Sequence, residues 1–327
     1  MRCVPDIVSS NIRHSCLRQN KISRTIILLY LLVGFFCVIH TSCSNELSKN
    51  LENSYDDNYG KKASIIADRV YSGKKVYMPI DIYFDALIYT FGENKEYGVI
   101  ISCVLEEKLH NDLHLLNVSF HPLNIEFVIR KVTPIIHRHN FKDKKEFDEG
   151  WLGEMLKISN EEGQSFCDRR AAEDRTVCSI FIQFSLGYGI SGLSKLPYWS
   201  DCMGIRICGP YISDYLLAHE FGHYFGLMHT FHQDINEGDF IDDTESGPEN
   251  VLFVGTPLDP NCDNIMTYSD ANEPRAFTKG QIEKMKRFMV AFRCEEIYEK
   301  IPEGCSGYEC AAGMINDAIL KLILKKD

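Results

Sequence analysis

Residues 213–230 read SDYLLAHEFGHYFGLMHT, and this stretch constrains structure and chemistry more than any other part of the chain. Ser213 is a good helix N-cap and Gly226 a good C-cap, so the segment between them is predicted to be a helix. His219 and His223 stand four positions apart, and a helix places both imidazoles on one face, one turn from each other. That separation suits two positions of a tetrahedral zinc site.

The residues that follow complete the predicted site. Gly226 lets the chain turn sharply, which allows His229 to return as a third nitrogen ligand. Three protein ligands leave a fourth position for water, and this open position distinguishes a catalytic zinc from a structural one. Glu220 projects about 100° round the helix from His219, so it stands beside the ion without being needed to bind it. We therefore predict a zinc site formed by His219, His223 and His229, with Glu220 next to it.

Hydrolysis of a peptide bond is the chemistry that this arrangement predicts. A zinc-bound water has its pKa lowered to about 7, and Glu220 can take its proton as the water attacks a metal-polarised carbonyl. The same carboxyl can then hand the proton to the leaving amine. A buried helix with hydrogen-bonded histidines is the structural alternative. The functional alternative is a non-catalytic, surface-anchored binding protein that retains a structural zinc, but such a protein has no need of Glu220.

This segment and two later ones resemble the metzincin zinc metalloproteases. Residues 219–229 are similar to the elongated zinc motif of that family, and Asn-Ile-Met-Thr-Tyr at residues 264–268 is similar to its Met-turn. Residues 230–231, 238–244 and 277–285 narrow the resemblance to the pappalysin-like (cytophagalysin) branch.

An α+β fold of the metzincin-like zincin type is what the resemblance implies. A mixed twisted sheet and an active-site helix would lie above a cleft, and an irregular helical subdomain would lie below it. We expect a catalytic domain over residues 63–298, with an upper subdomain (63–226) and a lower one (227–298). A C-terminal tail (299–327) with a helix would follow.

Two residues of the Met-turn gain roles from the same resemblance. Met266 would form an apolar floor beneath the three imidazoles. Tyr268 would approach the zinc side of the cleft and steady the oxyanion of the tetrahedral intermediate, because a phenol can donate to developing negative charge in a dry site. A packed aromatic ring with a solvated hydroxyl is the alternative for Tyr268.

Apolar patterning predicts several other elements. Residues 75–84 alternate between apolar and polar side chains, as a strand does, whereas residues 97–113 carry apolar clusters at helical spacing. Further strands are predicted over residues 125–130 and 178–184, and further helices over residues 278–292 and 311–326. Thr278 and Gln281 resemble a capping box for the first of these helices. The last helix is expected to dock on the core, with a membrane-surface helix as the alternative.

The N-terminal segment has the pattern of an export signal. Residues 26–39 contain no charge, and residues 1–43 hold five bases and one acid. Fourteen helical residues span about 21 Å, short of the roughly 30 Å hydrocarbon core, which favours a signal over a permanent membrane helix. Ile-His-Thr-Ser-Cys at residues 39–43 resembles a bacterial lipoprotein cleavage box, so Cys43 would carry the lipid. We expect a leader (1–43), a polar tether (44–62), and an exported envelope lipoprotein, with ordinary secretion as the alternative.

The composition excludes two broad classes. A chain of 327 residues with 45% hydrophobic residues has enough apolar material for a core, which excludes disorder as its main state. The formal net charge of -11 argues against electrostatic binding of nucleic acids. The expected partner is a protein or peptide substrate, with membrane contact only through the lipid on Cys43.

Two further interpretations concern calcium and disulfides. Carboxylates crowd residues 234–245, and oxygen ligands of this kind suit calcium; the expected ligands are Asp239, Asp242 and Asp243, with a solvated acidic loop as the alternative. An exported protein can form disulfides. The candidate pairs are Cys167 with Cys178, Cys202 with Cys208, and Cys305 with Cys310.

Overall fold

The computed structural model of the chain describes most residues beyond position 56. The described residues are 57–92, 96–102, 106–161, 173–186, 190–194, 196–197, 204–209, 215–231, 239–245, 256, 259–268 and 275–324. The expected leader (1–43) and most of the expected tether (44–62) lie outside them. Among the described residues, no helix combines the length and the apolar character needed to cross a membrane.

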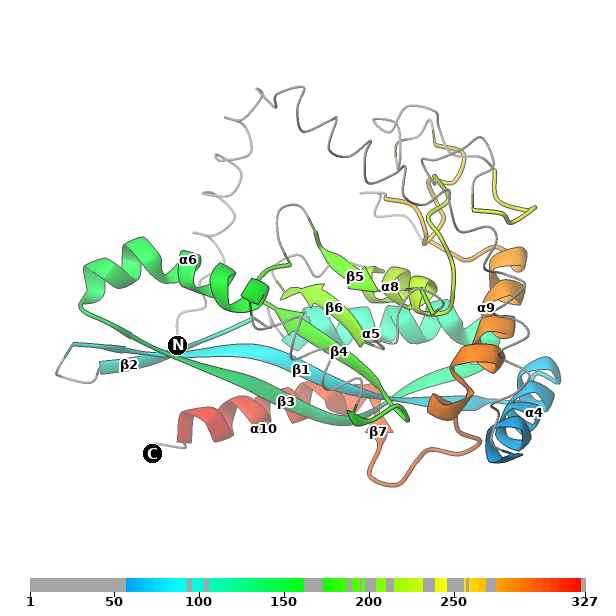
Figure 1. Cartoon of the computed structure of the whole chain (residues 1–327), viewed down its shortest axis with the longest axis horizontal. Helices are drawn as coiled ribbons and strands as arrows, with labels where there is room; N and C mark the ends of the chain where they lie inside the picture. Colours follow the sequence, from blue (N-terminus) through cyan, green and yellow to red (C-terminus); the bar gives the residue numbers. More distant parts are fainter. Residues whose placement is uncertain are drawn as a thin grey trace. The chain divides into compact units, whose positions relative to one another are not determined.

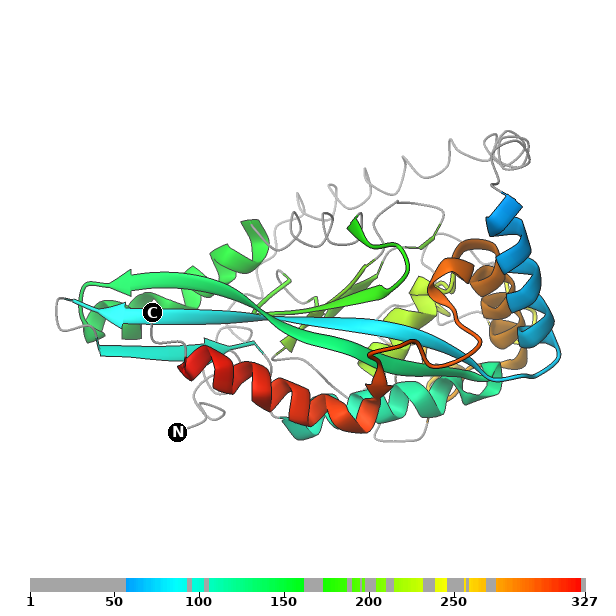
Figure 2. The ribbon, with the colours of Figure 1, turned by 90° about the horizontal axis from the view of Figure 1, so that it is seen from below.

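A mixed, twisted sheet forms the centre of the unit that begins at Asp57 (Figure 1). Its strands are β1 (Val76–Phe91), β2 (Glu96–Ile101), β3 (Ile125–Phe141), β4 (Cys178–Gln183), β5 (Gly192–Ser194), β6 (Gly204–Cys208) and β7 (Ser306–Gly307). The order across the sheet is β5-β6-β4-β1-β3-β7. Strand β2 lies outside this order and pairs with residues 86–91 of β1, whereas β4 pairs with residues 80–84 of β1. Strands β1, β3, β4 and β6 are parallel, whereas β2, β5 and β7 run antiparallel to their neighbours. The long strands β1 and β3 wind round each other along their length (Figure 2).

Helices cover this sheet and close its ends. They are α4 (Asp57–Tyr71), α5 (Glu106–Phe120), α6 (Lys144–Glu161), α8 (Leu216–Tyr224), α9 (Lys279–Phe292) and α10 (Ala311–Leu324). Helices α5 and α10 pack against β3, while α8 packs against α5, β5 and β6. Parallel strands are normally covered on both faces, and β1 is accordingly buried without interruption from Met78 to Leu87. The predicted combination of helices with a mixed twisted sheet is confirmed.

An aromatic cluster joins the sheet to α8. The Phe120 ring, at the end of α5, lies 5.3 Å from the ring of Phe127 in β3 and 6.2 Å from that of Phe221 in α8. It also contacts Phe225, directly after α8, and Phe277, just before α9. Because large buried rings fix the distances between the elements that carry them, this cluster positions α8 against the sheet.

Most predicted elements are found in the structure, but residues 97–113 are not one helix. The first part forms β2, which pairs with β1, and α5 begins only at Glu106. The consecutive residues Val99, Ile100 and Ile101 fit a strand as well as a helix, and β-branched side chains favour the strand. Short apolar runs do not distinguish the two by periodicity alone.

Part of the expected tether, before Ala63, is helical. Helix α4 starts at Asp57. The Tyr59 hydroxyl donates to the Ala291 carbonyl at 2.8 Å, and the Lys62 ammonium donates to the Glu295 carbonyl at 2.6 Å. Polar residues that resemble a tether by composition therefore contact the C-terminal part of the chain.

The C-terminal helix docks on the core. Helix α10 buries Ala311, Ile315 and Leu322 and packs on β3 and α5. Its apolar face is covered by protein, which agrees with core docking rather than with a membrane-surface helix.

The disulfide predictions are not supported by the described cysteines. Cys305 and Cys310 are both free thiols, so their predicted pairing is wrong. Cys178 and Cys208 are also reduced thiols, and their expected partners Cys167 and Cys202 lie outside the described residues.

Candidate active site

Helix α8 is shorter than the sequence predicts at its N-terminus and ends in a Schellman motif. Its N-cap is Tyr215, which makes no side-chain capping bond, whereas the expected N-cap Ser213 lies outside the described residues. At the other end, the Leu227 amide donates to the Gly222 carbonyl and the Gly226 amide donates to the His223 carbonyl. Gly226 has a φ of 89°, a left-handed conformation that glycine adopts without strain. The predicted sharp turn after the helix is present.

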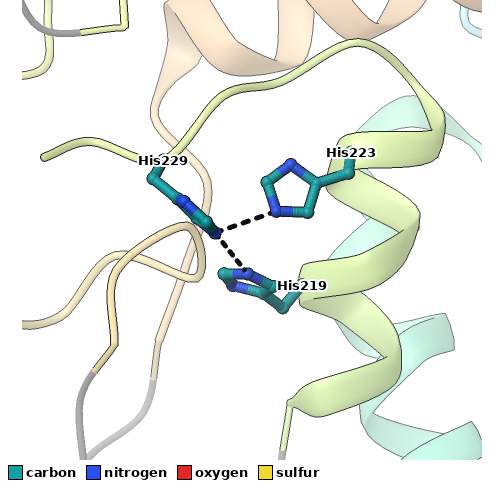
Figure 3. A group of neighbouring side chains, drawn as sticks. All are labelled: His219, His223 and His229. Carbon is teal, nitrogen blue, oxygen red and sulfur yellow. Dashed lines mark hydrogen bonds between the residues drawn. The ribbon is translucent and has the colours of Figure 1, made fainter. Parts of the chain in front are cut away.

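This turn brings three imidazoles together. His219 and His223 project from α8, and His229 reaches them from the segment beyond the turn (Figure 3). The Nε2 atom of His229 lies 3.1 Å from that of His219 and 3.0 Å from that of His223. One nitrogen from each ring lies within 4.8 Å of the others. Among the described residues, no other cluster of three or more histidine, cysteine or acidic side chains converges in this way.

Backbone carbonyls orient the two helix histidines. His219 Nδ1 donates to the Ile265 carbonyl at 2.7 Å, and His223 Nδ1 donates to the Leu227 carbonyl at 2.8 Å. A carbonyl only accepts, so the proton of each neutral ring is on Nδ1 and the Nε2 lone pair faces the other rings. Burial lowers the pKa of His219 to about 3, aided by nearby His223, and lowers that of His223 to about 4. Both rings are therefore neutral at physiological pH, as metal ligands must be.

The donor set fits zinc. Nitrogen ligands roughly 2.0–2.1 Å from a tetrahedral ion are about 3.3 Å apart, close to the observed spacing of the Nε2 atoms. Three imidazoles from a helix and the following segment are a ligand set typical of zinc. Calcium prefers oxygen, so it does not suit this site.

Glu220 is a buried carboxylate beside the triad. It is 4% exposed, and its Oε2 atom has no hydrogen-bond partner among the described residues. Burial raises the pKa of this carboxyl to about 8, because a low-dielectric surrounding disfavours the charged form. A nearby dication would lower this pKa again, since it favours the carboxylate. Gly192 of β5 lies directly against it, and a Cβ atom there would stand 2.3 Å from Oε1.

The Met-turn lies under α8. Met266 is fully buried, and a Cβ atom on Gly222 would stand 2.3 Å from the Met266 sulfur, so sulfur and helix backbone are in close contact. Tyr268 is 60% exposed, with its ring 4.7 Å from the ring of His229 and 5.8 Å from that of His219. The Tyr268 side chain thus stands at the solvent side of the triad.

Phe231 is part of the site although the sequence gives it no role. Its ring stacks on that of His229, with centroids 4.8 Å apart and planes 8° apart, and it also contacts Tyr268. In the sequence, Phe231 is marked only by its position two residues after His229 and by its part in the resemblance to the pappalysin-like branch. Stacking on a ring beyond the turn depends on the path of the chain, which spacing does not reveal.

The predicted calcium ligands do not form a cation site. Asp243 is used at the start of α9, where it accepts from the Thr278 hydroxyl and the Gly280 amide, both at 2.7 Å. Asp239 accepts from the Ile241 amide and the Thr244 hydroxyl within its own loop. Asp242 does not join them in a cluster. Protein donors thus occupy both oxygens of Asp243 and one oxygen of Asp239, and the three carboxylates form no cluster among the described residues, so the calcium interpretation is not supported.

Three comparisons with known proteins each found similar proteins. The peptidase M43 family model, described as pregnancy-associated plasma protein-A, matches residues 187–290. An extracellular metalloprotease of Pyricularia oryzae is 24% identical over 208 residues, which cover 57% of this chain and 68% of that protein. Among solved structures, Tannerella forsythia mature mirolysin in complex with a cleaved peptide is 17% identical, with a TM-score of 0.41, covering 66% of this chain and 96% of that one. The family match and the fungal relative confirm the predicted resemblance to the pappalysin-like metalloproteases.

The turn after α8 can be tested with two glycines of similar backbone conformation. Gly226 packs against the Phe288 ring, 2.4 Å from an added Cβ, whereas Gly73, with a φ of 72°, has no atom closer than 3.8 Å. Alanine at either position should lower the free energy of unfolding by about 1–3 kcal/mol, because both are left-handed. Only Gly226→Ala should weaken zinc binding, measured by competition with a chromogenic chelator. Equal zinc affinity in the two variants would show that the turn does not position His229.

Proposed function

We propose that this chain is a zinc-dependent endopeptidase, with His219, His223 and His229 as metal ligands and Glu220 as the general base. One observation carries the proposal: three imidazoles converge with their Nε2 atoms beside a buried carboxyl group whose Oε2 atom has no hydrogen-bond partner among the described residues. A structural zinc clip would account for the imidazoles. It would not account for a carboxylate that is buried at a cost and whose Oε2 atom accepts no hydrogen bond from the part of the chain that the structure describes.

Zinc, when bound, supplies Lewis-acid chemistry, since it polarises a substrate carbonyl and makes water more acidic. Glu220 accepts a proton from the attacking water while the water oxygen bonds to the carbonyl carbon. Its carboxyl then returns that proton to the amide nitrogen as the C–N bond breaks. The buried position of Glu220 keeps other water away from this proton and favours a carboxyl that can hold it between the two steps.

The substrate is proposed to bind as an added strand along β5. This strand is at the end of the sheet, and its outer edge pairs with no other strand of the described residues. Gly192, on the same strand, contacts Glu220, so a peptide on this edge would pass close to the general base. Addition to an edge uses backbone hydrogen bonds and needs no free chain terminus, which supports cleavage within a polypeptide.

Tyr268 is proposed to donate to the oxyanion. Its ring lies near two of the three histidines, and its exposed position leaves the hydroxyl free to approach a substrate from the solvent side. Neighbouring protein groups partly desolvate the Tyr268 hydroxyl, and this desolvation and the nearby Glu220 carboxylate raise its pKa, so the phenol keeps its proton and can act as a donor.

We also propose that the protein is exported. The apolar, uncharged segment at residues 26–39 supports this, and the relative in Pyricularia oryzae is described as extracellular. A lipid on Cys43 would add an anchor. The mass of the mature N-terminus distinguishes the two forms: a lipidated Cys43 supports the anchor, and an unmodified later residue supports ordinary secretion.

The general base is tested by Glu220→Gln, which keeps the shape of the side chain but cannot take the proton. Cleavage of an unstructured polypeptide should fall by about 10²–10⁴-fold, with one zinc still bound per chain.

Tyr268→Phe should lower the rate of cleavage by up to about 10²-fold, because an exposed donor contributes less than a buried one. Mass spectrometry should find internal fragments from the native protein and none after chelation.

A carboxylate outside the site provides the control. Glu283 on α9 is partly exposed and pairs with Lys286, so Glu283→Gln should leave cleavage unchanged. Wild-type rates in Glu220→Gln would refute the assigned base. A zinc-loaded native protein that cleaves no polypeptide would favour the binding protein with a structural zinc.

A further inference from the structure

A buried charged pair contacts the last residue of α8. Arg293 directly follows α9, Glu296 ends the short turn η5 (Cys294–Glu296), and each is 1% exposed. The Tyr224 hydroxyl donates to Glu296 Oε2 at 2.5 Å, and the Arg293 guanidinium lies 3.6 Å from the centre of the Tyr224 ring. Arg293 Nη1 lies 3.5 Å from Glu296 Oε1. Both charged residues therefore meet at Tyr224, the neighbour of the metal ligand His223.

Arg293 also completes the hydrogen bonds at the end of α8. The last four carbonyls of an α-helix have no partner in the regular pattern of the helix. Here the carbonyls of Phe221, Gly222 and His223 accept from the amides of residues 225, 227 and 226. The Tyr224 carbonyl accepts from Arg293 Nε at 3.4 Å. A cation at this end of the helix is also favoured by the helix dipole.

The last turn of α8 and the residues after it position two of the three metal ligands. His223 is in it, the Leu227 carbonyl that orients His223 is at its exit, and His229 follows two residues later. A shift of Tyr224 would therefore move two of the three imidazoles and the carbonyl that holds one of them.

Stability alone is a poor reason for burying this pair. Removing two charges from water is costly, and apolar residues of similar volume often stabilise a protein as well or better. Burial raises the pKa of Glu296 to about 7, while Arg293 and the Tyr224 hydroxyl oppose that rise. Tyr224 and the residues that flank Glu296 and Arg293 in sequence, Cys294 and Ile297, belong to the hydrophobic core, so an apolar pair suits this position.

We propose that Arg293 and Glu296 are positioning residues of the metal site, which fix the last turn of α8 and thereby the placement of His223 and His229. This inference rests on the proposed zinc function. Neither residue touches the substrate or the reacting atoms. Their effect reaches the metal through Tyr224 and the backbone of the turn.

The decisive variant replaces both charges, Arg293→Met with Glu296→Leu. Because no unpaired charge is left in the core, the unfolding midpoint should stay near that of the native protein. Zinc release to a chelator should nevertheless be about 10–100-fold faster, which is the usual effect of losing a group that orients a metal ligand. The visible spectrum of the Co²⁺-substituted protein should change as well.

Two further variants separate a positioning role from general destabilisation. Arg293→Lys retains the paired charge but loses the Nε donor, so it should also release zinc faster with little loss of stability. Asp81→Asn disturbs another ion pair, between the buried Asp81 of β1 and the partly exposed Arg130 of β3. It should lower the unfolding midpoint and leave zinc release and the Co²⁺ spectrum unchanged.

The outcomes separate this inference from the proposed function. Native protein that binds no zinc would overturn the proposed function. Native protein that binds zinc, together with folded Arg293 variants that release it at the native rate with an unchanged Co²⁺ spectrum, would overturn the positioning role alone. If Asp81→Asn accelerated zinc release as much, the effect would be general destabilisation, and the inference would also fail.

Discussion

Two backbone carbonyls decide which nitrogen of each helix histidine faces the centre of the site. The Ile265 carbonyl, in the Met-turn, fixes His219, and the Leu227 carbonyl, at the exit of α8, fixes His223. If either bond were lost, the imidazole could rotate or exchange its proton between nitrogens, and the ligand lone pair would no longer point at the ion. The rest of the structure holds these two segments in place against α8.

Close packing around α8 holds the Met-turn and the segment after the helix in place. Glycine occupies the positions where the helix or its carboxylate is approached most closely: Gly192 of β5 against Glu220, Gly222 against Met266, and Gly226 against Phe288 of α9. At each of them a Cβ atom would overlap its neighbour, so side chains larger than hydrogen would push β5, the Met-turn or α9 away from the site. The aromatic cluster around Phe120 fixes the helix from the direction of the sheet.

The sequence predicts best what depends on local spacing. The spacing of four positions from His219 to His223 places both side chains on one helix face, and Thr278 with Gln281 forms the predicted capping box on α9. What depends on the path of the chain is not predicted. The apolar residues of β2 fit a helix as well as a strand, and only pairing with β1 distinguishes the two. Asp243 resembles a calcium ligand because its partner, the start of α9, is distant in sequence. Nothing in the sequence distinguishes Arg293 and Glu296 from exposed charged residues, because their contacts with Tyr224 depend on the fold.

X-ray absorption at the zinc edge, on purified native protein, tests the central claim most directly, because it reports the number and kind of ligand atoms without requiring a substrate. The account predicts one zinc per chain with three imidazole nitrogens at about 2.0–2.1 Å and a remaining light-atom ligand. A first shell that contained sulfur, or fewer than three imidazoles, would contradict it, as would the absence of stoichiometric zinc.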